Sequence, residues 1–136
     1  MLIRLVISIF VFTVFIFGGS PAMGGDIVID ARFWGEWVPA KAPCTSKLRL
    51  KLESNLVTFI NGADHQEYSK LEQCYGCMGK EVEGFVWLTT DAMGDSPFTI
   101  FLDGTKKKIA LSVDFFNDKK LGKRFPFGKA ELKKCK

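Results

Sequence analysis

The feature that most limits the fold is a series of short segments, each ended by turn-forming residues. Residues 47–53, Lys-Leu-Arg-Leu-Lys-Leu-Glu, alternate without a fault and place three leucines on one face and four charged residues on the other. That period of two predicts a strand with one buried face. A β-branched and aromatic run follows at 56–60 and ends at Asn61-Gly62, a dipeptide typical of tight hairpins. The full set of strand-like segments is 26–33, 47–53, 56–60, 66–73, 81–90, 97–102, 107–116 and 129–135, of which 66–73 has a helical turn as its alternative.

About eight closely spaced strands, without any long helical pattern, favour an all-β antiparallel barrel or sandwich. A closed barrel removes exposed sheet edges, so we expect a small up-and-down barrel, with a β-sandwich as the alternative. The inward side chains of such a barrel either fill it or surround one small ligand. The many Leu and Phe residues favour a filled interior, and a hollow one remains the alternative. The expected inward residues are Leu48, Leu50, Leu52, Phe98, Ile100, Leu102, Ile109, Leu111, Val113 and Leu132.

Residues 1–24 of the 136-residue chain are predicted to form a secretory signal peptide. Arg4 gives a basic start, an apolar run follows at 5–17, and small residues end the segment, with cleavage after Ala22 or Gly24. The alternative is a retained membrane anchor, but a spanning helix needs roughly 20 apolar residues. We therefore expect an exported protein, periplasmic or secreted, with one domain at 25–136 and no transmembrane segment after cleavage.

All four cysteines, Cys44, Cys74, Cys77 and Cys135, lie in the exported part, and an oxidising compartment predicts disulfide bonds. Four cysteines allow three pairings, and the sequence alone does not choose among them. Cys74-Tyr75-Gly76-Cys77 is short enough to close on itself, which would leave Cys44 with Cys135. The second of these bonds would stabilise the fold by roughly 4 to 5 kcal/mol in the chain-entropy model.

The Cys74-x-x-Cys77 motif also has chemical interpretations. Met78 stands where haem attachment requires His. A thiol oxidoreductase would place the motif at a helix N-terminus, whereas the flanking residues predict a turn and then a strand. Structural zinc needs four N or S ligands, and His65 is the only histidine. A copper site of His65, Cys74, Cys77 and Met78 would require free thiols. We therefore predict no metal and no cofactor, and keep thiol–disulfide exchange as the alternative function.

Gly35-Glu36-Trp37 contains the Gly-x-Trp pattern that opens lipocalins and related calycin barrels, and the chain resembles that family in this motif. The resemblance implies that Trp37 closes the base of the barrel by packing. Lipocalins are longer and carry a helix before the last strand, whereas only 119–123 could form even one turn here. The chain also resembles uncharacterised exported bacterial proteins that share a Gly-x-Trp opening and a Cys-x-x-Cys. These resemblances imply a lipocalin-like β-barrel and export, but no activity.

Aromatic residues are expected on the outer face of the sheet. Alternation places Phe85 and Trp87 outward on one strand and Phe101 outward on the next. A contiguous apolar patch usually marks a region that is covered or that binds something. We expect the later segment 124–128, Arg-Phe-Pro-Phe-Gly, to fold over these rings; the alternative is a surface for a partner. The candidate binding surface is Phe85, Trp87, Phe101, Phe125 and Phe127.

Charge is unevenly distributed along the exported part. Residues 25–104 hold 7 Lys and Arg against 12 Asp and Glu, while residues 105–136 hold 11 against 3. Such a basic block either binds anionic surfaces weakly or is a solvated face that protects sheet edges. We favour the solvated face, and an exported, Lys-rich block with a single Arg is a poor candidate for nucleic acid. The basic surface is Lys106, Lys107, Lys108, Lys119, Lys120, Lys123 and Arg124.

No catalytic residue is predicted. The sequence lacks Gly-x-Ser-x-Gly, His-Glu-x-x-His and Gly-Lys-Ser/Thr motifs, and His65 stands beside Asp64 next to an Asn-Gly turn. We therefore expect a binding protein that is not an enzyme and that binds a small apolar ligand or a protein partner. Small periplasmic barrels also serve as inhibitors of cell-wall hydrolases, and that specific function is considered by analogy only.

Overall fold

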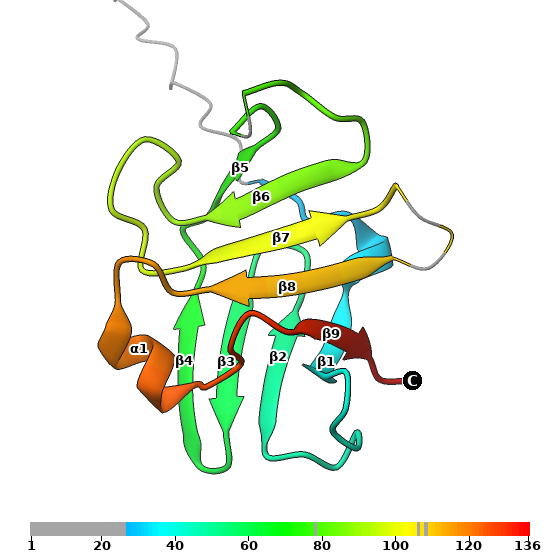
Figure 1. The fold of residues 1–136 in the computed structure, drawn as a ribbon, viewed down its shortest axis with the longest axis vertical. Coiled ribbons are helices and arrows are strands. Elements are labelled where there is room, and N and C mark those ends of the chain that lie inside the picture. Colours follow the sequence, from blue (N-terminus) through cyan, green and yellow to red (C-terminus); the bar gives the residue numbers. More distant parts are fainter. Residues whose placement is uncertain (1–26, 78, 106, 108) are drawn as a thin grey trace, which may run out of the picture.

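The structure, a computed structural model, describes residues 27–77, 79–105, 107 and 109–136 (Figure 1). The predicted signal peptide therefore lies outside the described residues. A short 3₁₀ helix, η1 (Ala31–Phe33), precedes the first strand. The other elements are β1 (Gly35–Pro39), β2 (Leu48–Leu52), β3 (Val57–Asn61), β4 (Asp64–Tyr68), β5 (Glu72–Cys74), β6 (Phe85–Thr89), β7 (Thr99–Asp103), β8 (Ala110–Asp114), α1 (Lys119–Arg124) and β9 (Glu131–Lys134).

The strands form one antiparallel sheet in the order β4-β3-β2-β1-β9-β8-β7-β6-β5. Successive strands pair with each other except β4 and β5, which are the two edges, and the last strand pairs with the first through Val38 opposite Lys133. The sheet curls so that β6, β7 and β8 run crosswise to β2, β3 and β4 (Figure 1). The result is an up-and-down half-barrel that is split between β4 and β5.

The all-β class and the barrel-like curl are confirmed, but two details of the prediction are wrong. The described residues form nine strands rather than about eight, and the barrel is not closed, because no pairing joins β4 to β5 among them. The segment 26–33 is not a strand in its described part, and β1 begins only at Gly35, whose φ is 121°. The Asp30 carboxylate explains this difference, since it accepts a hydrogen bond from the Arg32 N–H and caps η1.

Side chains from both halves of the sheet fill the space between them. The predicted inward residues all belong to one buried hydrophobic cluster or pack against it. Phe59 lies in this cluster, and its ring centroid is 5.0 Å from that of Phe98 and 6.0 Å from that of Tyr68. Trp37 is 1% exposed, and its indole N–H donates to the Phe33 carbonyl at 2.8 Å. The interior of the half-barrel is therefore a packed aromatic and aliphatic core.

Two segments without strand pairing complete this core. Ile29 is fully buried, and its backbone N–H donates to Ser54 in the β2–β3 turn. Farther along the chain, the Asp118 carboxylate caps α1 by accepting from the Leu121 N–H at 2.8 Å. Leu121 points into the core. The N-terminal segment and α1 thus add apolar side chains to the core that the strands form.

Candidate functional site

Three aromatic residues lie on the outer face of β6 and β7, and we call Phe85, Trp87 and Phe101 the outer aromatic surface. Each is half-buried, whereas Leu88, which alternates with them, is fully buried in the core. Trp87 lies directly opposite Phe101 in the strand register. Their rings therefore meet edge to face, with centroids 5.2 Å apart and an interplanar angle of 88°. The outward direction of these rings agrees with the alternation in the sequence.

A groove of about 380 Å³ runs beside the outer aromatic surface. Ser112 lies in the same cross-strand row as Phe101, and Glu131 lies next in that row on β9. Asp103 and Lys129 also line the groove, so charged residues of both signs surround its apolar centre. The indole N–H of Trp87 is buried and donates to no acceptor among the described residues.

Phe125 and Phe127 do not belong to this surface, which corrects the prediction. They are 0% and 3% exposed, and their ring centroids lie 5.8 and 6.1 Å from that of Phe59 inside the half-barrel. The segment after α1 therefore fills the interior instead of folding over the outer rings. The physical reason is that this side of the split half-barrel offers two aromatic rings a fully buried apolar site. The candidate binding surface is thereby reduced to Phe85, Trp87 and Phe101.

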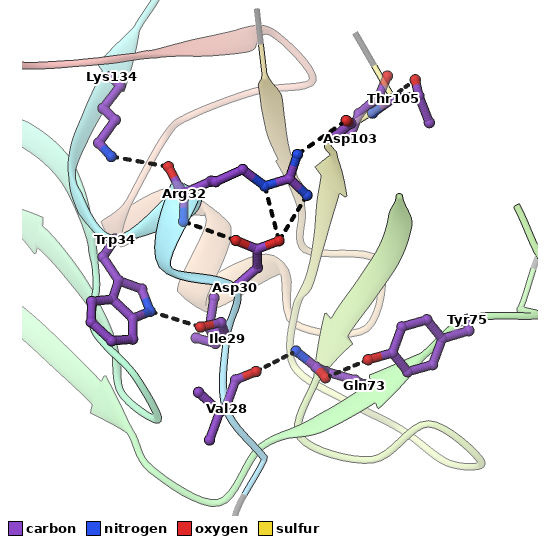
Figure 2. Close-up of polar contacts among 11 residues, drawn as sticks. Val28, Ile29, Asp30, Arg32, Trp34, Gln73, Tyr75, Asp103, Thr105 and Lys134 are labelled. Atoms are coloured by element: carbon purple, nitrogen blue, oxygen red, sulfur yellow. Dashed lines mark hydrogen bonds and ion pairs between the residues drawn. The ribbon is translucent and has the colours of Figure 1, made fainter. Parts of the chain in front are cut away.

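A second cleft, of about 340 Å³, opens where the N-terminal segment passes the ends of β6 and β7. We call it the mouth cleft. Arg32 donates from Nε and Nη2 to Asp30 Oδ2, at 3.0 and 2.7 Å (Figure 2). On the other side, Gln73 donates to the Val28 carbonyl at 3.4 Å and accepts from the Tyr75 hydroxyl at 2.9 Å. No local pattern in the sequence predicts this cleft, because its two walls come from segments far apart in the chain.

The chain matches no family model, no curated protein and no solved structure. Within the described residues, there is no helix both long enough and apolar enough to span a membrane. The chemistry of the two surfaces above is therefore the basis for assigning a function.

The predicted basic surface is divided in space. One group is exposed on α1, which follows β8, whereas Lys107 is exposed in the loop that precedes β8. The two groups lie at opposite ends of that strand (Figure 1). Lys106 and Lys108 lie outside the described residues. The group on α1 is Lys119, Lys120 and Lys123.

Arg124, the remaining member of the basic surface, is engaged in an ion pair. Its Nη2 lies 2.7 Å from Asp64 Oδ1, and its Nε lies 3.0 Å from Asp64 Oδ2. These hydrogen bonds lower the pKa of Asp64 below its usual 3.8 and raise the pKa of Arg124. The guanidinium also lies over the Phe125 ring, 5.0 Å from its centroid. The ion pair therefore ties α1 to the edge strand β4 and leaves Arg124 less available to an external anion.

The expected disulfide bonds are present, and of the three possible pairings the structure has the one in which the C-x-x-C motif closes on itself. Cys44 is bonded to Cys135 and Cys74 to Cys77, with Cα atoms 5.7 Å apart in both pairs. The first bond joins the loop after β1 to the residue after β9, beside the pairing of these two strands. Cys74 ends β5 and Cys77 lies in the following turn, where no helix begins in the described part of the chain. Because Cys74 lies opposite Trp87, this bond borders the outer aromatic surface.

His65 lies on the exposed edge strand β4, opposite Ile60. Cys74 and Cys77 are bonded to each other, so their thiols are not available to join His65 in a copper site. Met78, the fourth residue of that arrangement, lies outside the described residues. No group of three or more His, Cys, Asp and Glu side chains is arranged for a metal ion in the part of the chain that the structure covers.

Proposed function

We propose that this chain is an exported binding protein without catalytic activity that recognises a partner protein through the outer aromatic surface. The observation that carries the proposal is that Phe85, Trp87 and Phe101 remain half-exposed beside a groove while other side chains fill the interior. Large aromatic rings are enriched at the centres of protein interfaces, where they bury much area at a low cost in rotamer entropy.

The residues around the groove support a protein as the partner. Asp103, Lys129 and Glu131 place both signs of charge around an apolar centre, and specific protein interfaces combine an apolar core with such a polar rim. Trp87 supports the same view, since its buried N–H has no acceptor among the described residues. An unpaired buried donor lowers the stability of the fold by about 1–3 kcal/mol. A Phe would fill this position without that cost, so the presence of Trp indicates that the indole ring serves binding rather than stability.

A small apolar ligand is the alternative occupant. The core cluster fills the interior, so such a ligand would have to lie in the groove on the outer face of the sheet. Small-molecule sites enclose most of their ligand, and a groove on a sheet face encloses much less. The geometry therefore favours a protein partner with a large, complementary surface over a bound small molecule.

The disulfides support the exported compartment and bear on the alternative of thiol–disulfide exchange. Disulfides persist in oxidising compartments, and both pairs are bonded here. Cys74 lies at the end of a strand, without the helix N-terminus that activates thiols in redox enzymes. This placement favours a structural role for the pair. A cell-wall hydrolase is one partner compatible with export, by analogy only.

The proposal is tested by site-specific photo-cross-linking in the native host. A benzoylphenylalanine at position 101 should give a discrete, protease-sensitive adduct with a protein, because that ring faces the groove. The same group at position 119 is the matched control, since Lys119 is exposed on α1, away from the groove. Adding Trp87→Ser to the position-101 variant should abolish the adduct by removing the opposing ring.

Three results would contradict the proposal. One is the absence of any protein adduct at position 101, and another is an equal adduct at position 119. The third is a mass increase of only a few hundred daltons at position 101, which would support the small-ligand alternative.

A further inference from the structure

The mouth cleft has the size and position of a small-molecule site, and the proposed function does not use it. Its volume of about 340 Å³ lies within the usual range of roughly 300–1,000 Å³, and barrel mouths are common places for such sites. Its floor is apolar, because Phe33 and Leu102 reach it from the core and Val86 is half-buried beside them. Both of its walls carry polar side chains.

The first wall is the pair Asp30 and Arg32, whose charges offset each other. Three guanidinium hydrogen bonds are made, two to Asp30 Oδ2 and one, at 3.4 Å, to the Gly104 carbonyl. A guanidinium has five N–H groups, so two are left for a ligand. Gly104 allows this approach, since a Cβ there would lie 2.8 Å from Arg32 Nη2. Hydrogen bonding from Arg32 also lowers the pKa of Asp30, which keeps the pair ionised.

The second wall is formed by Gln73 and Tyr75, which hold each other in place. The Gln73 amide bridges the Val28 carbonyl and the Tyr75 hydroxyl, at 3.4 and 2.9 Å (Figure 2). This leaves one amide N–H on Gln73 as a donor and the phenol oxygen of Tyr75 as an acceptor. The Tyr75 side chain is 51% exposed. Glu83 also lines the cleft and is a member of none of the ion pairs between described residues.

The geometry points to a neutral mono- or disaccharide as the ligand of the mouth cleft. Every sugar hydroxyl both donates and accepts, and the cleft offers fixed donors on Arg32 and Gln73 beside acceptors on Tyr75 and Glu83. The C–H face of a sugar ring matches the apolar floor. A purely apolar ligand would bury these polar groups without partners, which is costly. An anionic ligand would meet Glu83 and an Asp30–Arg32 pair that is already neutralised. The Asp30–Arg32 and Gln73–Tyr75 pairs are already held by hydrogen bonds. Binding therefore immobilises few additional side chains, which keeps the loss of side-chain entropy small.

The test is a titration of the ¹⁵N-labelled, oxidised protein followed by amide chemical shifts. The probes are cellobiose, maltose, lactose and N,N′-diacetylchitobiose, with spermidine and octanoate as the cationic and apolar comparisons. At least one disaccharide should shift the amides of Asp30, Gln73 and Gly84 together, with a Kd of about 1 mM or tighter, the range of a site with few hydrogen bonds. Spermidine and octanoate should not shift this set.

Two variants locate the binding in the cleft. Tyr75→Ala should weaken the affinity about tenfold, because it removes one ring and one hydroxyl. Gly104→Ala should weaken it several-fold by displacing only the end of the Arg32 side chain, which leaves the fold intact. Lys119→Ala on α1 is the control and should leave the affinity unchanged.

The proposal is overturned if no disaccharide shifts the set of Asp30, Gln73 and Gly84 at concentrations about tenfold above 1 mM. It is equally overturned if spermidine or octanoate shifts that set instead, or if a sugar shifts only the amides of Trp87 and Phe101. Binding that is unaffected by both Tyr75→Ala and Gly104→Ala would place the sugar elsewhere and would also refute it. A sugar that shifts only the Trp87 and Phe101 amides would also count against the proposed protein partner, whereas the other results leave that partner untouched.

Discussion

Phe125→Ala tests whether the segment after α1 fills the interior of the half-barrel. The Phe125 side chain is fully buried, its centroid lies 5.8 Å from that of Phe59, and Arg124 lies 5.0 Å from it. Truncating a buried Phe to Ala lowers the free energy of unfolding by roughly 3–5 kcal/mol, through lost transfer energy and the cavity left behind. For a domain of this size, 1 kcal/mol corresponds to a Tm shift of about 4 °C. The variant should therefore melt roughly 12–20 °C below the wild type.

Phe116→Ala is the matched control, because it removes the same ring from the same connection where the side chain is 59% exposed. Its only described ring contact is with Lys129, at 5.9 Å, so the expected cost is below about 1 kcal/mol. Urea denaturation of the oxidised proteins, with the m-value checked for constancy, measures both changes. If Phe125→Ala cost no more than Phe116→Ala, the segment would not be part of the core.

Two further predictions concern the covalent and ionic links. Replacing Cys44 and Cys135 together by Ser should cost about 4–5 kcal/mol, since that bond closes a loop with a sequence separation of 91. Replacing Cys74 and Cys77, whose separation is 3, should cost only about 2 kcal/mol. The urea midpoints of both double variants check this order. Asp64→Asn should destabilise the protein at neutral pH, because the folded-state pKa of Asp64 is lowered below 3.8. The contribution of ionised Asp64 to the free energy of unfolding is present above the unfolded-state pKa and is lost as the pH falls through the folded-state pKa. The difference from the wild type in urea midpoint should therefore close once the pH falls below the lowered pKa of Asp64, and a difference that persists there would contradict the assignment.

The inward leucines were predictable because their strand has charged residues on its other face. Leu50 and Leu52 are fully buried, while Lys51 between them remains half-exposed. A shift of one residue would turn Arg49 and Lys51 into the core, and burying those charges is prohibitive. The register was thus fixed by local composition. The Cys44–Cys135 pairing was one of three that the sequence allowed, and only the structure distinguishes it from the other two.

The side of the sheet on which a connection runs was not predictable in this way. Two phenylalanines around a proline suit a position over the outer rings as well as one inside the half-barrel. The segment lies instead at the β3–β4 hairpin, where Asn61 donates to the Arg124 carbonyl, Arg124 pairs with Asp64, and Phe125 reaches Phe59. These contacts join parts of the chain that are distant in sequence, for which the sequence holds no local signal.

The C-x-x-C motif lies beside both candidate surfaces, and this position explains its structural role. The edge strand β5 has only three residues, and among the described strands it pairs only with β6. Because side chains alternate between faces, Cys74 lies opposite Trp87 on the outer aromatic surface, while Gln73 lines the mouth cleft. A short edge strand with few backbone hydrogen bonds opens readily. The Cys74–Cys77 bond restrains the turn that follows it, and so it helps to hold one strand that contributes to two surfaces.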